Sequence, residues 1–346
     1  MLFNKVRLKA TGSLVLMFMF TVLAYTQVES DSFPVRLMFY NTENLFDTYD
    51  DTLKDDDEFL PDGLMRWNRT RYFKKINSVY KTIIAAGEWN PPAIVGLCEI
   101  ENRKVLEDLV YGTALSNFGY GIIHEESPDP RGIDVSMIFR KDLVRVIDYR
   151  AWIPTGVRKD EFHSRSVLYV KCDVLGDTIH LIINHWPSRR GGVLAGEPLR
   201  EEVAQMVRNA VDSLYRVSKG ELKAIVFGDF NCSTDDPVIS SLFKSPVVGE
   251  RILFNLSDQH LKGVPGTYRY MGTWETLDQV IVSEGLMKSS RGLYTEKRNF
   301  RIFSPDFLLR NDSKYPGMTT FSTYRGYRYL GGFSDHLPVL LDIGFR

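Results

Sequence analysis

Cysteine is scarce in this chain, which has only three cysteines among its 346 residues. Cys98, Cys172 and Cys232 are odd in number, lie far apart and form no CxxC pair. This usage supports neither a disulfide framework nor a metal cage built from paired cysteines. Cys98 and Cys172 fall in apolar, strand-like runs, so we expect them to be buried free thiols.

A strong excess of charge of either sign is also absent. The 43 basic and 44 acidic residues give a formal net charge of −1. A protein that coats nucleic acid without specificity is usually strongly basic, because its affinity comes from neutralising phosphates. This class is excluded, whereas an enzyme needs only a local basic patch. With 44% hydrophobic and 25% charged residues, the chain is also not disordered, collagen-like or a coiled coil.

The apolar run near the N-terminus is too short to cross a bilayer, which takes roughly 20 residues. It covers Leu14–Leu23, follows the basic residues of segment 5–9 and precedes a small or polar stretch at 24–27. This order is typical of a secretory signal peptide, the alternative being a transmembrane anchor. We expect a cleaved signal peptide at residues 1–26 and an exported mature protein, periplasmic or extracellular, without stable membrane insertion. Cleavage would remove three basic and no acidic residues, which leaves the mature chain mildly acidic.

Strand-like and helical patterns alternate along the mature chain. The expected strands are Val35–Tyr40, Ala93–Leu97, Val135–Phe139, Val167–Asp173, Thr178–Asn184, Ala224–Phe227, Leu277–Val282 and Pro338–Ile343. The expected helices are Trp67–Ala86, Lys104–Tyr111 and Pro198–Val217. No repeat, low-complexity tract or Pro/Ser-rich linker divides the chain. We therefore expect residues 27–346 to form a single α/β domain.

Polar side chains gather where several of these strands end. The clusters are Asn41–Asn44, Cys98–Asn102, Asn184–Arg190, Gly228–Asn231, Asp278 and Ser334–His336. One carboxylate or asparagine after a strand is common in turns and helix caps. Because six clusters occur in one chain, we predict that they form a shared site at one rim of the sheets.

In this order the clusters resemble the endonuclease/exonuclease/phosphatase superfamily, which includes pancreatic deoxyribonuclease, abasic-site endonucleases, inositol polyphosphate phosphatases and neutral sphingomyelinases. The resemblance extends from about Val35 to Ile343, and the chain looks like a secreted, bacterial-type, deoxyribonuclease-like member. Its most specific motifs are "GDFN" at Gly228–Asn231 and "SDHLPV" at Ser334–Val339, backed by "LCEIEN" and "NHWPSR". The resemblance implies a four-layer αββα sandwich of two mixed β-sheets flanked by helices, with the active site at one rim.

Hydrolysis of a phosphate ester requires charge neutralisation at the phosphate, an activated water and help for the leaving oxygen. Carboxylate-bound Mg²⁺ or Mn²⁺ supplies the first, since these ions prefer oxygen ligands. By resemblance Glu99 is the principal metal ligand, with Asp335 and Asn41 near it, and Glu43 matches an acidic position found in part of the superfamily. Ca²⁺ is a further candidate ion. The acidic stretch Asp50–Glu58 is either a structural calcium site or, as such runs usually are, a solvated loop.

The resemblance also implies the catalytic roles. Asp229 orients and deprotonates the attacking water, and Asn231 donates its amide to the phosphate or the nucleophile. His336 faces the phosphate and is held by Asp278, because a carboxylate behind an imidazole fixes its tautomer and favours its charged form. His185 occupies the position of the second histidine of the deoxyribonuclease and sphingomyelinase branches.

Three residues are predicted to contact the substrate phosphate: Asn41, Asn231 and Arg165. Arg165 matches an arginine of the deoxyribonuclease branch, and a surface salt bridge is its alternative role. The remaining histidines match no motif, and we expect them to be exposed or satisfied polar residues; they are His124, His163, His180 and His260.

The substrate is the least determined property. Between Asp278 and Asp335 the sequence interleaves arginine with tyrosine and phenylalanine, which suits either a grip on phosphates and bases or a packed surface loop. The leading interpretation is an exported nuclease or phosphodiesterase acting on DNA or RNA as a monomer. The alternatives are an enzyme acting on small phosphate esters or phospholipid headgroups, as a sphingomyelinase does, and a binding protein that has kept the fold without catalysis.

Overall fold

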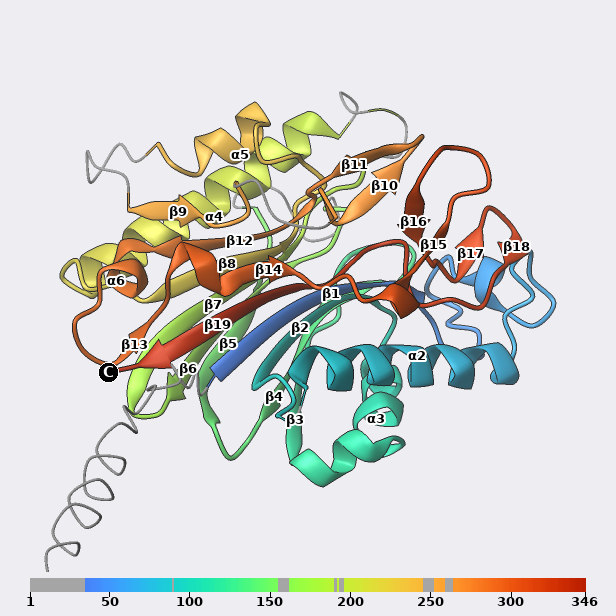
Figure 1. Ribbon diagram of the computed structural model, residues 1–346, viewed down its shortest axis with the longest axis horizontal. Helices are drawn as coiled ribbons and strands as arrows, with labels where there is room; N and C mark the ends of the chain where they lie inside the picture. Colours follow the sequence, from blue (N-terminus) through green and yellow to red (C-terminus); the bar gives the residue numbers. More distant parts are fainter. Residues whose placement is uncertain are drawn as a thin grey trace, which may run out of the picture. The chain divides into compact units, whose positions relative to one another are not determined.

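Two mixed β-sheets lie face to face in the computed structural model (Figure 1). The structure describes residues 35–88, 90–154, 162–189, 192, 196–244, 252–258 and 264–346, which belong to one compact unit, Phe33–Arg346. The signal peptide expected at residues 1–26 lies outside the described residues, as does His260.

The first sheet has the strand order β13-β19-β1-β2-β4-β3, and β14 pairs with β19 as well. Only the β1–β2 pair is parallel; the other pairs of this sheet are antiparallel. The strands are β1 (Val35–Leu45), β2 (Ile94–Ile100), β3 (Tyr120–His124), β4 (Asp134–Arg140), β13 (Leu293–Tyr294), β14 (Phe300–Ile302) and β19 (Val339–Phe345).

The second sheet has the strand order β5-β6-β7-β8-β12-β9, with β7 and β8 parallel and the other pairs antiparallel. Its strands are β5 (Val144–Trp152), β6 (Val167–Val174), β7 (Asp177–His185), β8 (Ala224–Asp229), β9 (Leu253–Asn255) and β12 (Asp278–Ser283). Both sheets therefore place two parallel strands side by side near the middle.

Alternating apolar side chains divide the core into layers, because successive residues of a strand point to opposite faces of the sheet. In β1, Leu37 and Phe39 belong to the core between the sheets, whereas Met38 and Tyr40 face the outer helices. β8 follows the same pattern: Phe227 packs between the sheets and Val226 on the outer side. Each central strand thus buries both of its faces.

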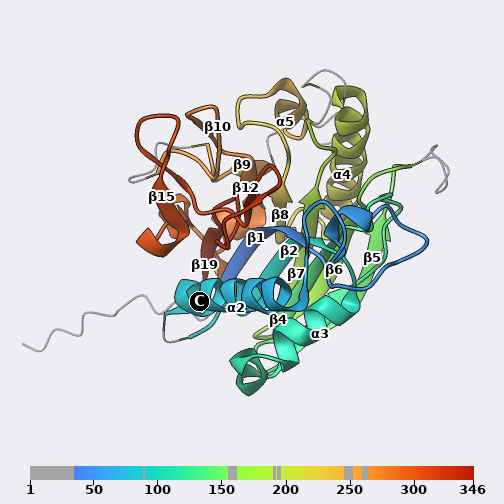
Figure 2. The same cartoon turned by 90° about the vertical axis from the view of Figure 1, so that its right-hand side faces the viewer.

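Helices cover the outer face of each sheet (Figure 2). On the first sheet lie α2 (Arg69–Gly87) and α3 (Arg103–Tyr111), and on the second lie α4 (Glu197–Val217) and α5 (Pro237–Ser241). Asn68 caps α2 by accepting two backbone N–H bonds, which satisfies donors at the helix start. The predicted four-layer αββα sandwich is confirmed, since helix, sheet, sheet and helix follow one another.

Short elements complete the described chain. They are η1 (Asp57–Phe59), η2 (Ala114–Phe118), α6 (Glu284–Met287), η3 (Lys297–Asn299), η4 (Asp306–Leu308) and the hairpins β10 (Tyr268–Tyr270) with β11 (Thr273–Glu275), β15 (Leu309–Asn311) with β16 (Met318–Thr320) and β17 (Tyr324–Arg325) with β18 (Arg328–Tyr329). Within the described residues, no helix combines the length and apolar character needed to cross a bilayer.

The structure contains a strand or helix at each position where the sequence predicts one. The largest shift in the bounds is in β1, which continues past Tyr40 through the polar cluster to Leu45. The strands β3, β5, β9, β13 and β14, the three small hairpins and the short helices α5 and α6 were not expected. Cys98, Cys172 and Cys232 are buried free thiols, as predicted for the first two.

Candidate active site

Three predicted site residues stand in register across neighbouring strands of the second sheet. His185 at the end of β7 pairs with Asp229 at the end of β8, and Asp278 at the start of β12 lies opposite Asp229. Gly228 allows this close arrangement, because a Cβ there would come 2.0 Å from the backbone oxygen of Asn184. Its φ of +147° is also one that side-chain-bearing residues rarely adopt. The "GDFN" motif therefore sets Asp229 on the rim.

Glu99 comes from the first sheet, where an irregularity in β2 directs its carboxylate. The pairing of β2 with β4 shifts register between Cys98 and Ile100, and Glu99 has a left-handed φ of +60°. Such a conformation costs on the order of 1–3 kcal/mol in a non-glycine residue and clusters at functional sites. The backbone N–H of Asn44, itself in left-handed conformation, donates to Glu99 Oε2 at 2.7 Å and holds the carboxylate in place.

Asn41 joins the two sheets at this rim. Its Nδ2 donates to Glu99 Oε1 at 3.3 Å and to Asp229 Oδ2 at 3.1 Å. Its Oδ1 accepts from the backbone N–H of Glu43 at 2.9 Å. Asn41 is thus placed to fix the spacing between the carboxylates of Glu99 and Asp229. Its amide nitrogen, and not its amide oxygen, points toward them.

His336 is held against Asp278, as the sequence predicts. Its Nδ1 lies 2.7 Å from Asp278 Oδ2, and its Nε2 lies 3.9 Å from Asp229 Oδ2. Burial disfavours the charged imidazole, but the carboxylates of Asp278 and Asp229 outweigh burial and raise the pKa of His336 well above its usual value. These surroundings therefore favour the imidazolium form of His336.

His185 lies on the other side of Asp229 and has the opposite electrostatics. Its Nε2 is 3.8 Å from both Glu99 Oε1 and Asp229 Oδ2. Burial, together with the positive charges of Arg165 and Arg131, lowers the pKa of His185 well below its usual value. A neutral and a charged imidazole therefore flank one carboxylate, whose own pKa is raised, chiefly by burial.

Negative charge accumulates beside these histidines, where the buried Glu43 lies near the partly buried Glu99 and Asp335. Burial, followed by the charges of Glu43 and Glu99, raises the pKa of Asp335 to about 7. The ammonium of Lys75 lies 3.7 Å from Glu43 Oε2 and donates to Thr323 and to the backbone oxygen of Phe333. Asp278 and Asp229 balance the charge of His336. The ammonium of Lys75 is therefore left to oppose Glu43, Glu99 and Asp335, which favours a bound cation.

Glu99 and Asp335 supply the oxygen donors that suit Mg²⁺ or Mn²⁺, and both line the cavity. Glu43 is engaged differently: its two carboxylate oxygens accept the backbone N–H groups of Thr323, at 2.5 Å, and of Tyr324, at 2.9 Å. The group formed by Asp229, Asp278 and His336 also has a spacing that suits a metal. His336 Nδ1 in this group already bonds to Asp278, so that nitrogen is not free to bind a metal ion.

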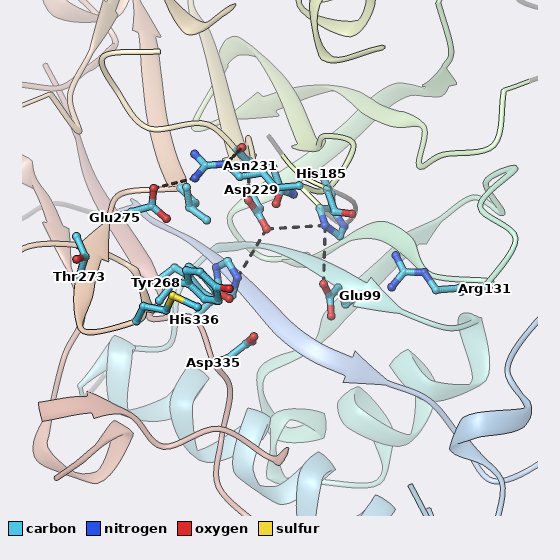
Figure 3. A pocket seen from close by; sticks show the side chains of 16 residues that line it. Glu99, Arg131, His185, Asp229, Asn231, Tyr268, Thr273, Glu275, Asp335 and His336 are labelled. Atoms are coloured by element: carbon cyan, nitrogen blue, oxygen red, sulfur yellow. Dashed lines mark hydrogen bonds and ion pairs between the residues drawn. The ribbon is translucent and has the colours of Figure 1, made fainter. Parts of the chain in front are cut away.

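These side chains open into one cavity of about 800 Å³ (Figure 3). Six of the predicted site residues line it: Glu99, His185, Asp229, Asn231, Asp335 and His336. Asn41 and Asp278 stand behind them through the hydrogen bonds described above. The structure thus brings together most of the predicted site, although the role of each residue stays a prediction.

Arg165 does not line the cavity in the described structure. It is buried, ion-pairs with Asp129 at 3.2 Å and donates to the backbone oxygen of Trp186, next to His185. Its neighbour in this network, Arg131, does line the cavity (Figure 3). Arg131 Nε lies 3.5 Å from Asp129 Oδ1. Sequence reasoning missed Arg131, which lines the cavity together with Arg189 of the "NHWPSR" motif. No motif marks Arg131, since "DPRG" is typical of a turn.

The opposite wall of the cavity was also missed. It is formed by the hairpin β10–β11, from which Tyr268, Tyr270 and Glu275 line the cavity. Arg189, from the "NHWPSR" motif, donates to Glu275 Oε1 at 2.7 Å and to the backbone oxygen of Asn231 at 2.7 Å. Three-residue strands carry too little periodicity to be found in a sequence.

The arginine- and tyrosine-rich segment Gly292–Tyr329 contributes no residue to the described lining of the cavity. Arg325 ion-pairs with Asp312 at 3.1 Å, and Tyr327 is 62% exposed. The segment contacts the site only indirectly in the described structure: the backbone N–H groups of Thr323 and Tyr324 donate to the carboxylate of Glu43.

Comparison with known proteins agrees with this geometry. A model of the family described as Endonuclease/Exonuclease/phosphatase family matches residues 36–344. Among solved structures, an endonuclease/exonuclease/phosphatase from Bacteroides vulgatus has a TM-score of 0.56 and 16% identity, with 90% of this chain and 99% of that chain covered. A mannosyl-6-phosphatase from Bacteroides thetaiotaomicron has a TM-score of 0.57 and 16% identity, with 90% and 100% covered.

A third similar structure is TDP2 of D. rerio complexed with a single-strand DNA product, with a TM-score of 0.53, 13% identity and 90% and 98% of the two chains covered. At these identities the likeness shows the fold alone. A search of curated proteins finds no match.

Proposed function

The chain belongs to the endonuclease/exonuclease/phosphatase family of divalent-metal-dependent phosphoric ester hydrolases, and we propose that it hydrolyses small phosphate esters in the cavity between its two sheets. The observation that carries this proposal is the convergence of Glu99, Asp335, Asp229, His185 and His336 on one cavity. Metal ligands, a base and an imidazolium are the groups that such a hydrolysis requires.

Glu99 and Asp335 would hold the metal ion, Mg²⁺ or Mn²⁺. When bound, the ion neutralises charge on the phosphate oxygens and on the leaving oxygen. Asn41 keeps Glu99 and Asp229 at a fixed spacing through its Nδ2. We assign it a positioning role, since its Nδ2 faces both carboxylates while its Oδ1 accepts the N–H of Glu43.

Asp229 accepts the proton of the attacking water. Burial raises its pKa, which makes the carboxylate a stronger base than a solvated one. His336, charged and fixed by Asp278, stabilises the negative charge that develops at the phosphate. His185 is neutral and lies within 3.8 Å of Asp229 Oδ2, where one nitrogen can donate a hydrogen bond to the phosphate.

The preference for small esters rests on the ion pairs that arginines in and near the Gly292–Tyr329 segment form. Arg325 and the nearby Arg269 both pair with Asp312, and Arg301 pairs with Asp342. Arginines that hold the chain together in this way are poorly placed to track a polynucleotide. A phosphatase is also among the similar structures.

DNA or RNA as substrate remains the second candidate, and the β10–β11 hairpin favours it. Tyr270 and Met271 are 56% and 64% exposed beside the cavity, where a base could stack on the tyrosine ring. TDP2, complexed with a DNA product, is among the similar structures.

Substrate screening separates the two candidates. We expect p-nitrophenyl phosphate or bis-p-nitrophenyl phosphate to be hydrolysed with Mg²⁺ or Mn²⁺ at a kcat/KM above that for DNA, RNA or sphingomyelin. If instead DNA or RNA were preferred, and Arg325→Ala with Arg328→Ala flattened the salt dependence of binding, the enzyme would be a nuclease. If the protein hydrolysed none of these compounds, the proposal would be contradicted.

We further propose that the protein is exported after cleavage of residues 1–26. The support is the order of basic, apolar and small residues described above. N-terminal sequencing of protein from its host should find a start near Tyr25 to Glu29 in a fraction outside the cytoplasm. An intact Met1 in a membrane fraction would favour an anchor.

A further inference from the structure

The loop between β1 and α2 concentrates carboxylates that the hydrolytic site does not use (Figure 1, right). Between Asp47 and Glu58 the chain has seven acidic residues and a single lysine. One carboxylate oxygen from each of Asp50, Asp56 and Asp57 falls in a group whose members all lie within 4.8 Å of one another. Exposed acidic groups are common without any ion, so a second observation is required.

Asp56 supplies that observation. Its side chain is 2% exposed, and its Oδ1 is buried with no hydrogen-bond partner among the described residues. Its Oδ2 accepts only the backbone N–H of Asp51, at 3.1 Å. A buried carboxylate oxygen without a partner is destabilising unless a cation or a donor satisfies it.

The lysine of the loop does not provide that cation. Lys54 Nζ donates to the backbone oxygens of Ser127 and Asp129, both at 3.2 Å, which directs its charge toward the neighbouring loop. The three carboxylates therefore repel one another, and none of the described contacts of Lys54 compensates their charge. Oxygens that share one Ca²⁺ at about 2.3–2.6 Å lie no more than roughly 5 Å apart, which matches the spacing of this group.

We propose that Asp50, Asp56 and Asp57 form a structural Ca²⁺ site that is separate from the hydrolytic metal site. Waters and backbone oxygens would complete the six to eight ligands that Ca²⁺ takes. Because two of the three carboxylates are exposed, we expect a dissociation constant of roughly 10⁻⁴–10⁻³ M, as in extracellular calcium modules.

The site would stabilise the loop that presents Arg131 to the cavity. Besides the bonds of Lys54, the backbone N–H of Asp55 donates to the oxygen of Pro130 at 2.8 Å. The same loop carries Asp129, which ion-pairs with Arg131 and Arg165. A cation bound at Asp56 therefore orders a segment that leads directly to one wall of the cavity.

The test is calcium binding by the full chain, followed by thermal unfolding and by terbium luminescence. Trp67 packs edge-on against Phe59 of η1, which begins at Asp57, so its indole is placed to sensitise a bound terbium ion. At a free Ca²⁺ concentration 100-fold above the dissociation constant, we expect the melting temperature to rise by about 4 °C.

Variants decide where the ion binds. The double variant Asp50→Asn/Asp57→Asn changes only exposed side chains and should lose the melting shift and weaken terbium binding at least about tenfold. Asp56→Asn should do the same; if it fails to fold, the double variant decides. Asp62→Asn, an exposed aspartate outside the group, should behave as wild type. Glu99→Gln changes the hydrolytic site, so it should lose activity but keep the calcium-dependent rise in melting temperature.

A calcium shift that survived in the double variant, or that vanished in Glu99→Gln alone, would overturn the proposal, because the ion would then bind elsewhere. The absence of any shift or terbium signal in the wild type would also overturn it. None of these outcomes depends on which ester is hydrolysed.

Discussion

Replacing Asp229 by asparagine removes the proposed base while preserving its shape. In the structure Asp229 Oδ1 accepts the N–H of Asn231 at 2.9 Å, and Oδ2 accepts Nδ2 of Asn41 at 3.1 Å. A carboxamide has only one acceptor oxygen, so one of these two bonds is lost and an amide nitrogen then faces a donor. The substitution also removes a buried negative charge, which is unfavourable in the folded protein because burial raises the pKa of Asp229.

The lost hydrogen bond and the removed charge change the free energy of unfolding in opposite directions. Whichever of the two prevails, the site is left without its base. One lost buried hydrogen bond costs about 1–3 kcal/mol, and relief from burying a charge offsets part of it. General-base catalysis contributes about 10²–10⁴-fold, which corresponds to roughly 3–5 kcal/mol in activation free energy. Turnover should therefore fall by that factor while the protein remains folded.

The assay is kcat on p-nitrophenyl phosphate or bis-p-nitrophenyl phosphate at saturating Mg²⁺ or Mn²⁺, with the unfolding midpoint measured in parallel. Asp235→Asn is the matched control, because it removes an exposed carboxylate from the segment that follows the same motif. It should leave both quantities unchanged. A folded Asp229→Asn enzyme with nearly full turnover would refute the assignment of the base.

Three further perturbations test other parts of the site and fold. Asn231→Ala should lower turnover on the order of 10²–10³-fold, whereas a change in KM alone would make it a binding residue only. Arg131→Ala should raise KM for small esters by roughly tenfold with little loss of unfolding stability; an unchanged KM would exclude contact with substrate. Burial, with Lys171 nearby, lowers the pKa of His180 to about 4. As the pH falls, the unfolded chain binds this proton before the folded protein does. The contribution of neutral His180 to stability is therefore present above pH about 6.5 and should be lost between about 6.5 and 4. The urea midpoint should fall over this range in the wild type but not in His180→Gln.

Strand ends were predictable because two separate signals coincide there. The apolar run into Asp229 marks a buried strand, and the glycine before it marks a backbone that approaches its neighbour closely. The register of His185, Asp229 and Asp278 follows from three such strands lying side by side. Which strands pair, however, is a tertiary property that local pattern does not contain.

The missed residues act through contacts distant in sequence. Lys54 bonds to the backbone oxygen of Asp129 in the loop that presents Arg131, and Tyr268 forms an isolated bridge with His336. Arg165 matched a motif, yet burial against Trp186 removes it from the cavity lining. Motif resemblance locates a residue in the fold, whereas its exposure depends on packing.

The central claim is that Glu99 and Asp335 bind the metal that makes this chain a phosphoesterase. Its most direct test is ester hydrolysis after removal of bound metal with excess chelator, followed by titration with Mg²⁺ or Mn²⁺. We predict no turnover with chelator, full recovery in the wild type and, for Glu99→Gln, at least about tenfold more metal at half-maximal activity. Undiminished turnover in excess chelator, or normal metal affinity in Glu99→Gln, would contradict the account.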